Sequence, residues 1–256
     1  MLKITNLVKY YGSNLAIDNL NLEIPDHTIF GFIGPNGAGK TTTIKLISTL
    51  IEPTKGEITI KGTNVTKKPQ EVKKLIGYIP DTPFLYEKLT GREFIQFAGD
   101  IFKIDRKIID NQINELNKFL GFGDWLDNLI ESYSHGMKQR IVIASALIHN
   151  PYLLLVDEPM VGLDPLSAKK VKDLFKKQSQ SGNIVFISTH TLSLAEEICD
   201  LVGVIHHGKL IYLGSPKQIV QEKDKSLEEV FLQITAEQVD QYPTSSTLSP
   251  TPTSSE

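Results

Sequence analysis

A glycine-rich octapeptide, GPNGAGKT at residues 34–41, is the segment whose spacing most directly predicts chemistry. It fits the pattern G-x-x-x-x-G-K-[ST], in which glycines let the backbone curve so that its N–H groups point at phosphate oxygens. Lys40 would supply a positive charge to the β- and γ-phosphates, and the Thr41 hydroxyl would bind Mg²⁺. An ordinary glycine-rich turn is the alternative, which a strand before the loop and a helix after it disfavour. The nucleotide-binding residues predicted here are Gly34, Pro35, Asn36, Gly37, Ala38, Gly39, Lys40, Thr41 and Thr42.

Two adjacent carboxylates, Asp157 and Glu158, follow the apolar run YLLLV at residues 152–156. Such a run suits a strand that is buried on both faces of a parallel sheet. Asp157 is the natural partner for Mg²⁺, directly or through water, and Glu158 can approach the γ-phosphate as a general base. Strand ends often carry acids for structural reasons alone, but the abrupt change from apolar residues to Asp-Glu-Pro favours the catalytic interpretation.

Strands and helices in alternation would position these residues. Apolar periodicity and turn residues predict strands at 2–8, 20–24, 28–33, 56–62, 76–80, 152–159 and 183–189, with a hairpin at 201–214. The same criteria predict helices at 40–51, 92–104, 107–122, 136–150, 167–179 and 192–198. This order indicates an α/β protein in which a helical lobe, at about 86–150, is inserted in the core. Residues 241–256 are rich in Pro, Ser and Thr and are predicted to form a disordered tail.

The composition is typical of a soluble globular protein, with 256 residues, 40% of them hydrophobic and 22% charged. Apolar runs are far shorter than the roughly 18 residues of a spanning helix, and the N-terminus lacks the apolar stretch of a signal peptide, so we expect a cytosolic chain. A net charge of −3 argues against nucleic acid as a partner. Cys199 is expected to act as a small buried hydrophobe, and the lysines at 67, 68, 73 and 74 as a solvated face.

A third motif, YSHGMKQR at residues 133–140, lies between the phosphate loop and the acidic strand. It resembles the signature motif of ABC-type ATPases, and GPNGAGKT, LLLVDEP, GLDP (162–165) and STH (188–190) stand in the order and spacing of that family. The resemblance covers about residues 2–214. It implies a P-loop NTPase (RecA-like) core with a mainly parallel sheet, an N-terminal antiparallel β lobe and an inserted α-helical lobe. Residues 1–240 would form this single cassette, with ATP and Mg²⁺ as its cofactors.

Cassettes of that family pair head to tail, so that the signature helix of one closes on the ATP held by the other. The resemblance implies that Ser134, His135 and Gly136 contact the nucleotide in this way, where a hydroxyl, N–H groups and a helix N-terminus favour an anion. Asp164 matches the acid of the loop at the dimer interface. His135 departs from the usual glycine, and Met137 from a common glutamine.

Further residues are assigned by the same resemblance. His190 matches the histidine that contacts the γ-phosphate and helps place the attacking water. Tyr11 matches the aromatic residue that stacks on adenine, with Tyr10 as a possible substitute.

Asp81, in the segment IPDTPFLYEKLT at residues 79–90, stands where the family commonly has a glutamine that links the metal and water site to the membrane partner. Its carboxylate can offer a hard oxygen to Mg²⁺, but it adds negative charge near Asp157 and Glu158. We therefore predict that Asp81 takes part in catalysis and metal binding and makes hydrolysis slower or more dependent on the partner. The alternative is that Asp81 only caps a turn.

The predicted function is that of an ATP-hydrolysing ABC transporter subunit, which powers a separate multispanning permease at the cytoplasmic face of the cell membrane. YSHGMKQR and SLEEVF (226–231) resemble export systems, and two copies are expected to pair. The alternative is a soluble ABC ATPase of translation or DNA repair, although those typically carry two cassettes or a long coiled-coil insertion. A GTPase would want N-K-x-D, whereas Asn117-Lys118 is followed by Phe119-Leu120. The sequence leaves open the cargo, the direction of transport and whether the paired cassettes are identical.

Overall fold

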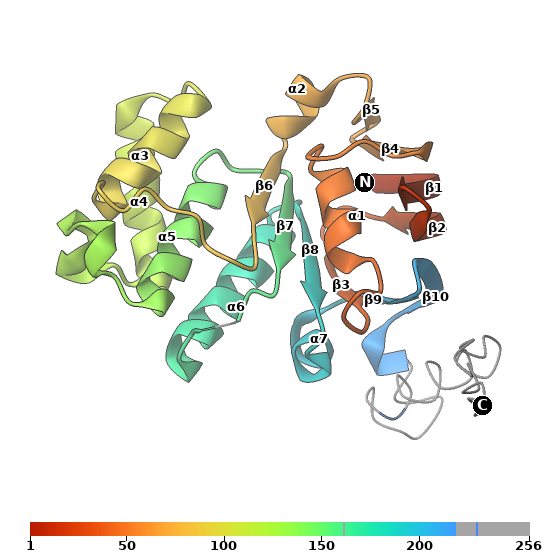
Figure 1. The fold of residues 1–256 in the computed structure, drawn as a ribbon. Helices are drawn as coiled ribbons and strands as arrows, with labels where there is room; N and C mark the ends of the chain where they lie inside the picture. The colour runs from red at the N-terminus through yellow and green to blue at the C-terminus, as the bar shows by residue number, and fades with distance from the viewer. Residues whose placement is uncertain (161, 219–228, 230–256) are drawn as a thin grey trace, which may run out of the picture.

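A six-stranded sheet forms the centre of the computed structural model, which describes residues 1–160, 162–218 and 229 (Figure 1). Its strand order is β10-β9-β3-β8-β7-β6, and all neighbours are parallel except the pair β9–β10. The strands are β3 (Ile29–Ile33), β6 (Ile76–Ile79), β7 (Leu153–Asp157), β8 (Ile184–Thr189), β9 (Leu201–His206) and β10 (Lys209–Gly214). Every residue of β3, β7 and β8 is buried, which explains their continuous apolar sequences.

Each face of this sheet has its own apolar core. Helix α1 (Lys40–Ile47) packs on one face together with the N-terminal β lobe, around Phe30, Phe32 and Phe186. Helices α5 (His135–Leu147), α6 (Pro165–Gln180) and α7 (Leu192–Ile198) pack on the other face. Burying the strands on both faces is what parallel sheets require, because their strands offer no polar face to water.

The N-terminal β lobe is a separate antiparallel sheet of order β2-β1-β4-β5. It consists of β1 (Leu2–Tyr11), β2 (Asn14–Ile24), β4 (Lys55–Ile60) and the short β5 (Thr63–Asn64). A short helix, α2 (Pro69–Lys73), leads from this lobe to β6. The sequence patterns did not predict β5 or α2, which are too short to show a period.

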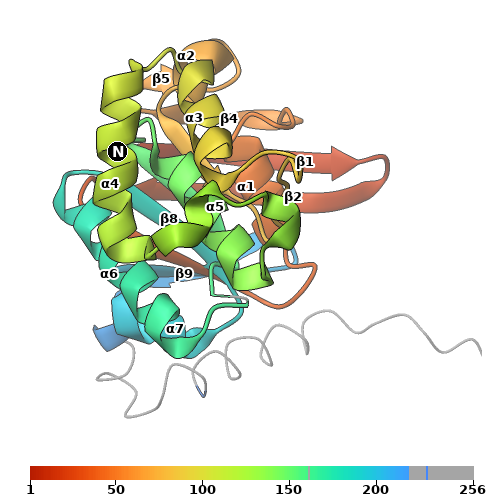
Figure 2. The ribbon, with the colours of Figure 1, turned by 90° about the vertical axis from the view of Figure 1, so that its left-hand side faces the viewer.

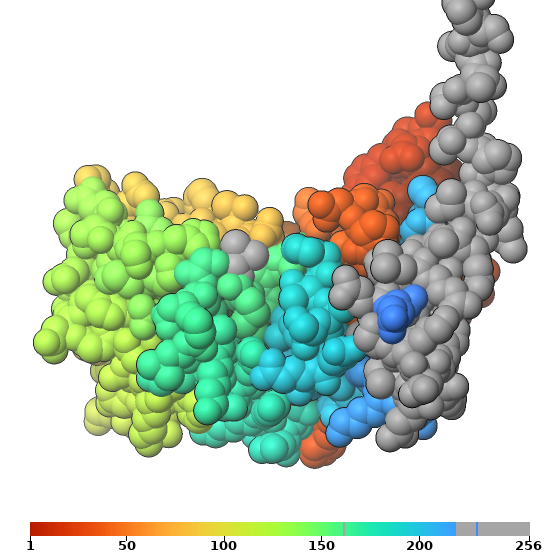
Figure 3. All heavy atoms as spheres, turned by 90° about the horizontal axis from the view of Figure 1, so that it is seen from below, coloured from red at the N-terminus to blue at the C-terminus, as the bar shows by residue number. Residues whose placement is uncertain are grey.

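A helical lobe interrupts the chain between β6 and β7. It contains α3 (Gly91–Ile101), α4 (Arg106–Leu120), two short 3-10 turns (Gly123–Asp127 and Ile130–Ser132) and the start of α5. A capping box begins α3, because the Thr90 hydroxyl accepts the Glu93 N–H while the Glu93 carboxylate accepts the Thr90 N–H. Figure 2 shows α3, α4 and α5 stacked at one side of the sheet. In Figure 3 the green helical lobe lies at the left and the red strands β1 and β2 of the β lobe at the upper right, with α6 and α7 between them.

The predicted fold class is confirmed: an α/β core with a mainly parallel sheet, an antiparallel β lobe and a helical lobe. Cys199 is half-buried and packs beside Ala195 and Val202, and burial raises the pKa of its thiol to about 12. Across the described residues, none of the helices is long and apolar enough to cross a membrane. The boundary at residue 240, the tail at 241–256 and most of SLEEVF lie outside the described residues.

Candidate active site

The carboxyl ends of neighbouring parallel strands bring the predicted catalytic residues to one edge of the sheet. The phosphate loop starts at Gly34 directly after β3, Glu158 follows β7, and His190 follows β8. Asp81 comes two residues after the end of β6. This edge is where open α/β sheets bind their ligands, because the loops that leave the strands converge there.

Lys40 is held inside the phosphate loop. Its ammonium group donates hydrogen bonds to the carbonyl oxygens of Gly34 at 2.7 Å and Pro35 at 3.0 Å. Burial lowers the pKa of Lys40, while the charges of Glu158 and Asp157 act in the opposite direction. The loop therefore keeps its own cation close to the position where phosphate oxygens would arrive.

Glycine is required at two points of this loop. Gly37 and Gly39 adopt φ values of +80° and +114°, which residues with a Cβ rarely adopt. At Gly39 a Cβ would also lie 2.9 Å from the carbonyl oxygen of Ala16. The loop is thus curved in the way that phosphate binding by backbone N–H groups demands.

Thr41 and Asp157 form a pair of hard oxygen donors. The Thr41 hydroxyl donates to Asp157 Oδ2 at 3.0 Å, and Asp157 is only 4% exposed. Burial raises the pKa of Asp157, and the hydrogen bond from Thr41 partly opposes this; the charges of Glu158 and Asp81 raise the pKa further. A bound Mg²⁺ would favour the ionised form of Asp157, because its positive charge would offset the cost of ionising a buried carboxylate. The Asp157 carboxylate and the Thr41 hydroxyl therefore fit a site for Mg²⁺.

Glu158 is fixed by several hydrogen bonds at the end of β7. Its backbone adopts φ +50°, and its N–H donates to the Ser188 carbonyl at 2.9 Å. The carboxylate accepts hydrogen bonds from the Thr189 hydroxyl and the His190 N–H, both at 3.1 Å, and lies 2.7 Å from His190 Nδ1. The exposed imidazole of His190 therefore contacts the residue predicted to be the base.

A cavity of about 430 Å³ lies beside the phosphate loop, Asp157 and Glu158, and His190 does not line it. The predicted residues on its wall are Tyr11, Asn36, Gly37, Gly39, Lys40, Thr41, Thr42, Asp81, Asp157 and Glu158. Gly34, Pro35 and Ala38 belong to the same loop but do not line the cavity. Tyr11 does so and Tyr10 does not, which favours Tyr11 as the aromatic residue of the site.

Two other segments line the cavity although the sequence motifs did not assign them. They are the start of β2 at residues 14–16 and the β9–β10 turn at His207 and Gly208. The HHG sequence at residues 206–208, between two apolar segments, indicates a hairpin. It contains no signal that places the hairpin beside the phosphate loop, which lies about 170 residues earlier in the chain.

Ser134 and Asp164 do not line this cavity, and each caps a helix instead. Ser134 is the N-cap of α5, where its hydroxyl accepts the Met137 N–H at 3.3 Å. Asp164 is the N-cap of α6, where its carboxylate accepts the N–H groups of Leu166 and Ser167 at 3.0 Å each. The Ser167 hydroxyl, which donates to Asp164 Oδ2 at 2.6 Å, and these N–H groups hold the pKa of Asp164 below its usual value. Both side chains are exposed, so a second molecule could approach them.

His135, the residue in place of the usual signature glycine, contacts the loop before α6. A Cβ added to Gly162 would lie 1.9 Å from His135 Cδ2, so the imidazole covers Gly162 of the same chain. Gly162 adopts φ +78°. A Cβ on Gly136 would meet the Gly162 carbonyl at 3.0 Å. The two predicted interface segments are thus packed against each other.

Comparisons with known proteins identify the fold and the family of this arrangement. Residues 17–161 match the family model described as ABC transporter. The bacitracin transport ATP-binding protein BcrA of Bacillus licheniformis is 43% identical over 212 residues, which are 82% of this chain and 68% of that protein. The daunorubicin/doxorubicin resistance ATP-binding protein DrrA of Streptomyces peucetius is 34% identical over 218 residues, 85% of this chain and 66% of that protein.

Solved structures agree with these matches. An ATP-binding subunit of an ABC transporter superposes with a TM-score of 0.86 at 30% identity, covering 92% of this chain and 99% of the other. The dimeric, post-hydrolysis ATP-binding cassette MJ0796, bound to ADP and Pi, superposes with a TM-score of 0.76 at 25% identity, covering 84% of this chain and 98% of the other.

Proposed function

Because this chain belongs to the ABC transporter family and is an ATP-binding, ATP-hydrolysing subunit, we propose that it powers a separate multispanning permease that exports a small molecule. The names of its relatives, bacitracin transport and daunorubicin/doxorubicin resistance, support a role in transport out of the cell. They give no support to the alternative of a soluble ATPase in translation or DNA repair. Association with the permease would place the chain at the cytoplasmic face of the membrane.

The observation that carries the catalytic proposal is the contact between Glu158 and His190 beside the phosphate loop. Glu158 would accept a proton from the attacking water, and His190 would orient both the carboxylate and the γ-phosphate. Lys40 would exchange its two carbonyl partners for phosphate oxygens. Mg²⁺ would be held by Thr41 and Asp157 and, when bound, would neutralise charge on the phosphates.

Nucleotide contacts from a second copy complete this proposal. Ser134, His135, Gly136 and Asp164 lie outside the cavity of their own chain. They present two helix N-termini, which favour anions. The dimeric cassette MJ0796 supports pairing. We therefore propose a head-to-tail homodimer in which these residues close over the ATP of the partner.

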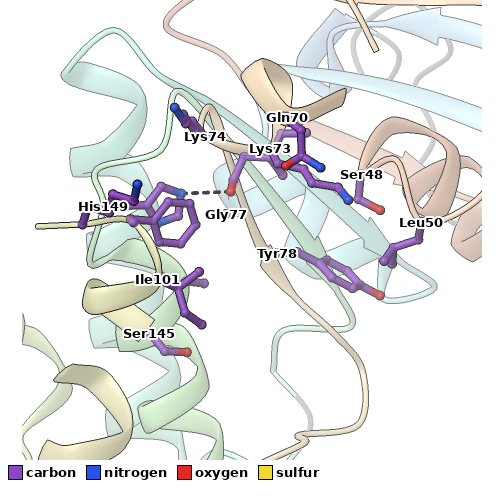
Figure 4. Close-up of a pocket in the computed structure, with 14 residues that line it drawn as sticks. Ser48, Leu50, Gln70, Lys73, Lys74, Gly77, Tyr78, Ile101, Ser145 and His149 are labelled. Carbon is purple, nitrogen blue, oxygen red and sulfur yellow. Dashed lines mark hydrogen bonds between the residues drawn. The ribbon is translucent and has the colours of Figure 1, made fainter. Parts of the chain in front are cut away.

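A larger cavity, of about 590 Å³, is the proposed docking place of the permease (Figure 4). It lies between α2 and β6 on one side and the ends of α3 and α5 on the other, and Ile101, Phe102 and Tyr78 line it. One turn before Ile101 on α3, the Phe97 ring packs against Tyr86, and Tyr86 also packs against Phe84, which is 77% exposed. These exposed aromatic residues and the cavity at the end of α3 would accept an amphipathic segment of the partner.

Asp81 lies on the strand-to-loop connection between the two cavities. Tyr78 lines the larger cavity, and three residues later Asp81 lines the nucleotide cavity. Asp81 raises the pKa of Asp157 through its charge. We propose that movement of this connection on permease binding alters how strongly Asp81 opposes ionisation of Asp157, which would make hydrolysis depend on the partner.

Two measurements test the proposed function. Co-purification from gently solubilised membranes should recover a multispanning protein; recovery of ribosomes or nucleic acid instead would overturn the transport assignment. Steady-state ATPase rates of Asp81→Gln and Asp81→Asn should exceed wild type without the permease and respond less to it. Unchanged rates in both conditions would refute the role of Asp81 and leave the transport assignment standing.

A further inference from the structure

The β9–β10 turn contributes an imidazole to the nucleotide cavity that no family motif accounts for. His206 pairs with Lys209 across the hairpin, so His207 and Gly208 form a two-residue turn, and His207 lines the cavity. Their φ values are +46° and +76°. Two positive φ values at the centre of a hairpin characterise a type I′ turn, in which Asn and Gly are the favoured residues. His207 thus occupies a backbone conformation that Asn or Gly would adopt with less strain.

Hydrogen bonds fix this turn to the phosphate loop and to β2. The Gly208 N–H donates to the Ala38 carbonyl at 2.9 Å, and the Gly208 carbonyl accepts the Asp18 N–H at 2.9 Å. A Cβ on Gly208 would lie 2.7 Å from the Ala16 carbonyl oxygen. The Cα of His207 therefore has a defined position relative to the loop that receives the phosphates.

Strand order determines on which side of the phosphate loop His207 lies. Along the sheet the order is β9, β3, β8, β7, β6, so the loop after β3 has β9 on one side and the strands that carry Glu158 and Asp81 on the other. His207 therefore lies on the side away from the acids. On that side the cavity wall also includes Tyr11 and residues 14–16, which are contributed by the β lobe.

The negative charge of the cavity wall means that a further hydrogen-bond donor at His207 would help to bind an anionic nucleotide. The described residues of the cavity wall include three carboxylates, those of Asp81, Asp157 and Glu158, and one lysine, Lys40. A neutral imidazole offers one N–H donor and a protonated one offers two, and both forms can bind phosphate or ribose oxygens.

We propose that His207 is a nucleotide-contacting residue that donates an imidazole N–H to the ribose or the α-phosphate of ATP. This proposal rests on the placement of the nucleotide in the cavity. It predicts that His207 contributes to the binding of ATP and ADP alike, because both carry the ribose and the α-phosphate. It also predicts no part for His207 in the chemical step, which takes place on the opposite side of the loop.

His207→Gly separates nucleotide contact from turn stability. Glycine suits the positive φ, so the variant should unfold at the same temperature as wild type or a higher one. Its Kd for ATP and for ADP should each rise by roughly 5–20-fold, as expected for the loss of one hydrogen bond, while kcat at saturating ATP stays close to wild type. His27→Gly, the same substitution at another histidine with positive φ (+59°) that does not line the cavity, is the matched control and should bind both nucleotides like wild type.

Equilibrium binding of ATP and ADP to the purified full chain, with thermal unfolding of the same samples, decides the proposal. Wild-type affinity in His207→Gly would overturn it, and so would weakened binding of ATP with unchanged binding of ADP, which would place the imidazole at the γ-phosphate. Lys40→Ala separates this outcome from failure of the proposed site. If Lys40→Ala loses ATP and His207→Gly does not, the cavity binds nucleotide and only the role of His207 is wrong.

Discussion

Removal of the charge on Glu158 is the most direct test of the catalytic assignment. Glu158→Gln preserves the length of the side chain and one acceptor oxygen, but a neutral amide cannot take a proton from water near pH 7. The remaining oxygen can still accept from His190 or from the Thr189 hydroxyl, which lie 2.7 Å and 3.1 Å from the carboxylate. The phosphate loop is untouched, so ATP should bind to the variant as to wild type.

The magnitude follows from the role of a positioned base. Such a base contributes about 10² to 10⁴ in rate, which corresponds to roughly 3–5 kcal/mol of transition-state stabilisation. His190 contacts the same carboxylate, so its contribution passes in part through Glu158. Groups in contact show coupling of about 0.5–3 kcal/mol. The variant that combines Glu158→Gln with His190→Ala should therefore be slower than Glu158→Gln alone, but by less than the full loss caused by His190→Ala in the wild type.

Steady-state ATPase rates and equilibrium ATP binding on wild type, the two single variants and the double variant complete the test. Glu115→Gln is the matched control, since this exposed glutamate on α4 pairs with Lys118 and does not line the nucleotide cavity. Its turnover should equal that of wild type. Turnover by Glu158→Gln near the wild-type rate would move the base elsewhere. Fully multiplicative losses in the double variant would refute the idea that His190 acts through Glu158.

Three further changes probe stability and packing. Burial raises the pKa of Asp157 above its value in the unfolded chain, so ionisation of Asp157 destabilises the nucleotide-free protein as pH rises through the folded pKa. Asp157→Asn should therefore have a higher melting temperature than wild type at pH 7, and the difference should disappear toward pH 4. The variant should also lose Mg²⁺-dependent ATPase activity. Gly162→Ala should lower the melting temperature, because its Cβ clashes with the His135 ring. Adding His135→Gly should recover only part of this loss, because alanine at position 162 would still have a positive φ. Equal losses of melting temperature with and without His135 would argue against the contact. Thr90→Ala removes the hydroxyl of the capping box and should cost about 1 kcal/mol in urea unfolding, and a neutral result would show that the α3 cap is not needed for stability.

Motifs whose chemistry depends on consecutive residues were predictable from the sequence. The phosphate loop needs a positive φ at Gly37 and Gly39 and a cation at Lys40, so a short run of neighbouring residues is enough to identify it. The acids at the end of β7 stand out because an apolar strand must precede them. Helix ends were less predictable. The helix predicted to reach residue 51 ends at Ile47, because Thr49 adopts φ +62°.

Contacts between distant segments could not be predicted from spacing alone. His135 departs from a family pattern, but only the fold shows that its ring covers Gly162 rather than pointing outward. Likewise, His207 carries no motif, and its place in the cavity depends on β9 lying beside β3. Both contacts are formed by side chains that local sequence rules treat as neutral, so tertiary structure alone gives them a role.

His135 and His207 lie in different surroundings, so they are expected to affect ATP binding in different ways. His135 stands where the family usually has glycine, and its ring covers Gly162 outside the nucleotide cavity of its own chain, so it would act on ATP only in the site completed by a second copy. His207 occupies a turn position that favours smaller residues, and its ring lies on the wall of the nucleotide cavity. Substitution of His135 should therefore act on the site completed by a second copy, whereas substitution of His207 should act on nucleotide affinity within a single chain. Binding measured on the monomer separates the two, because only His207 can change it there.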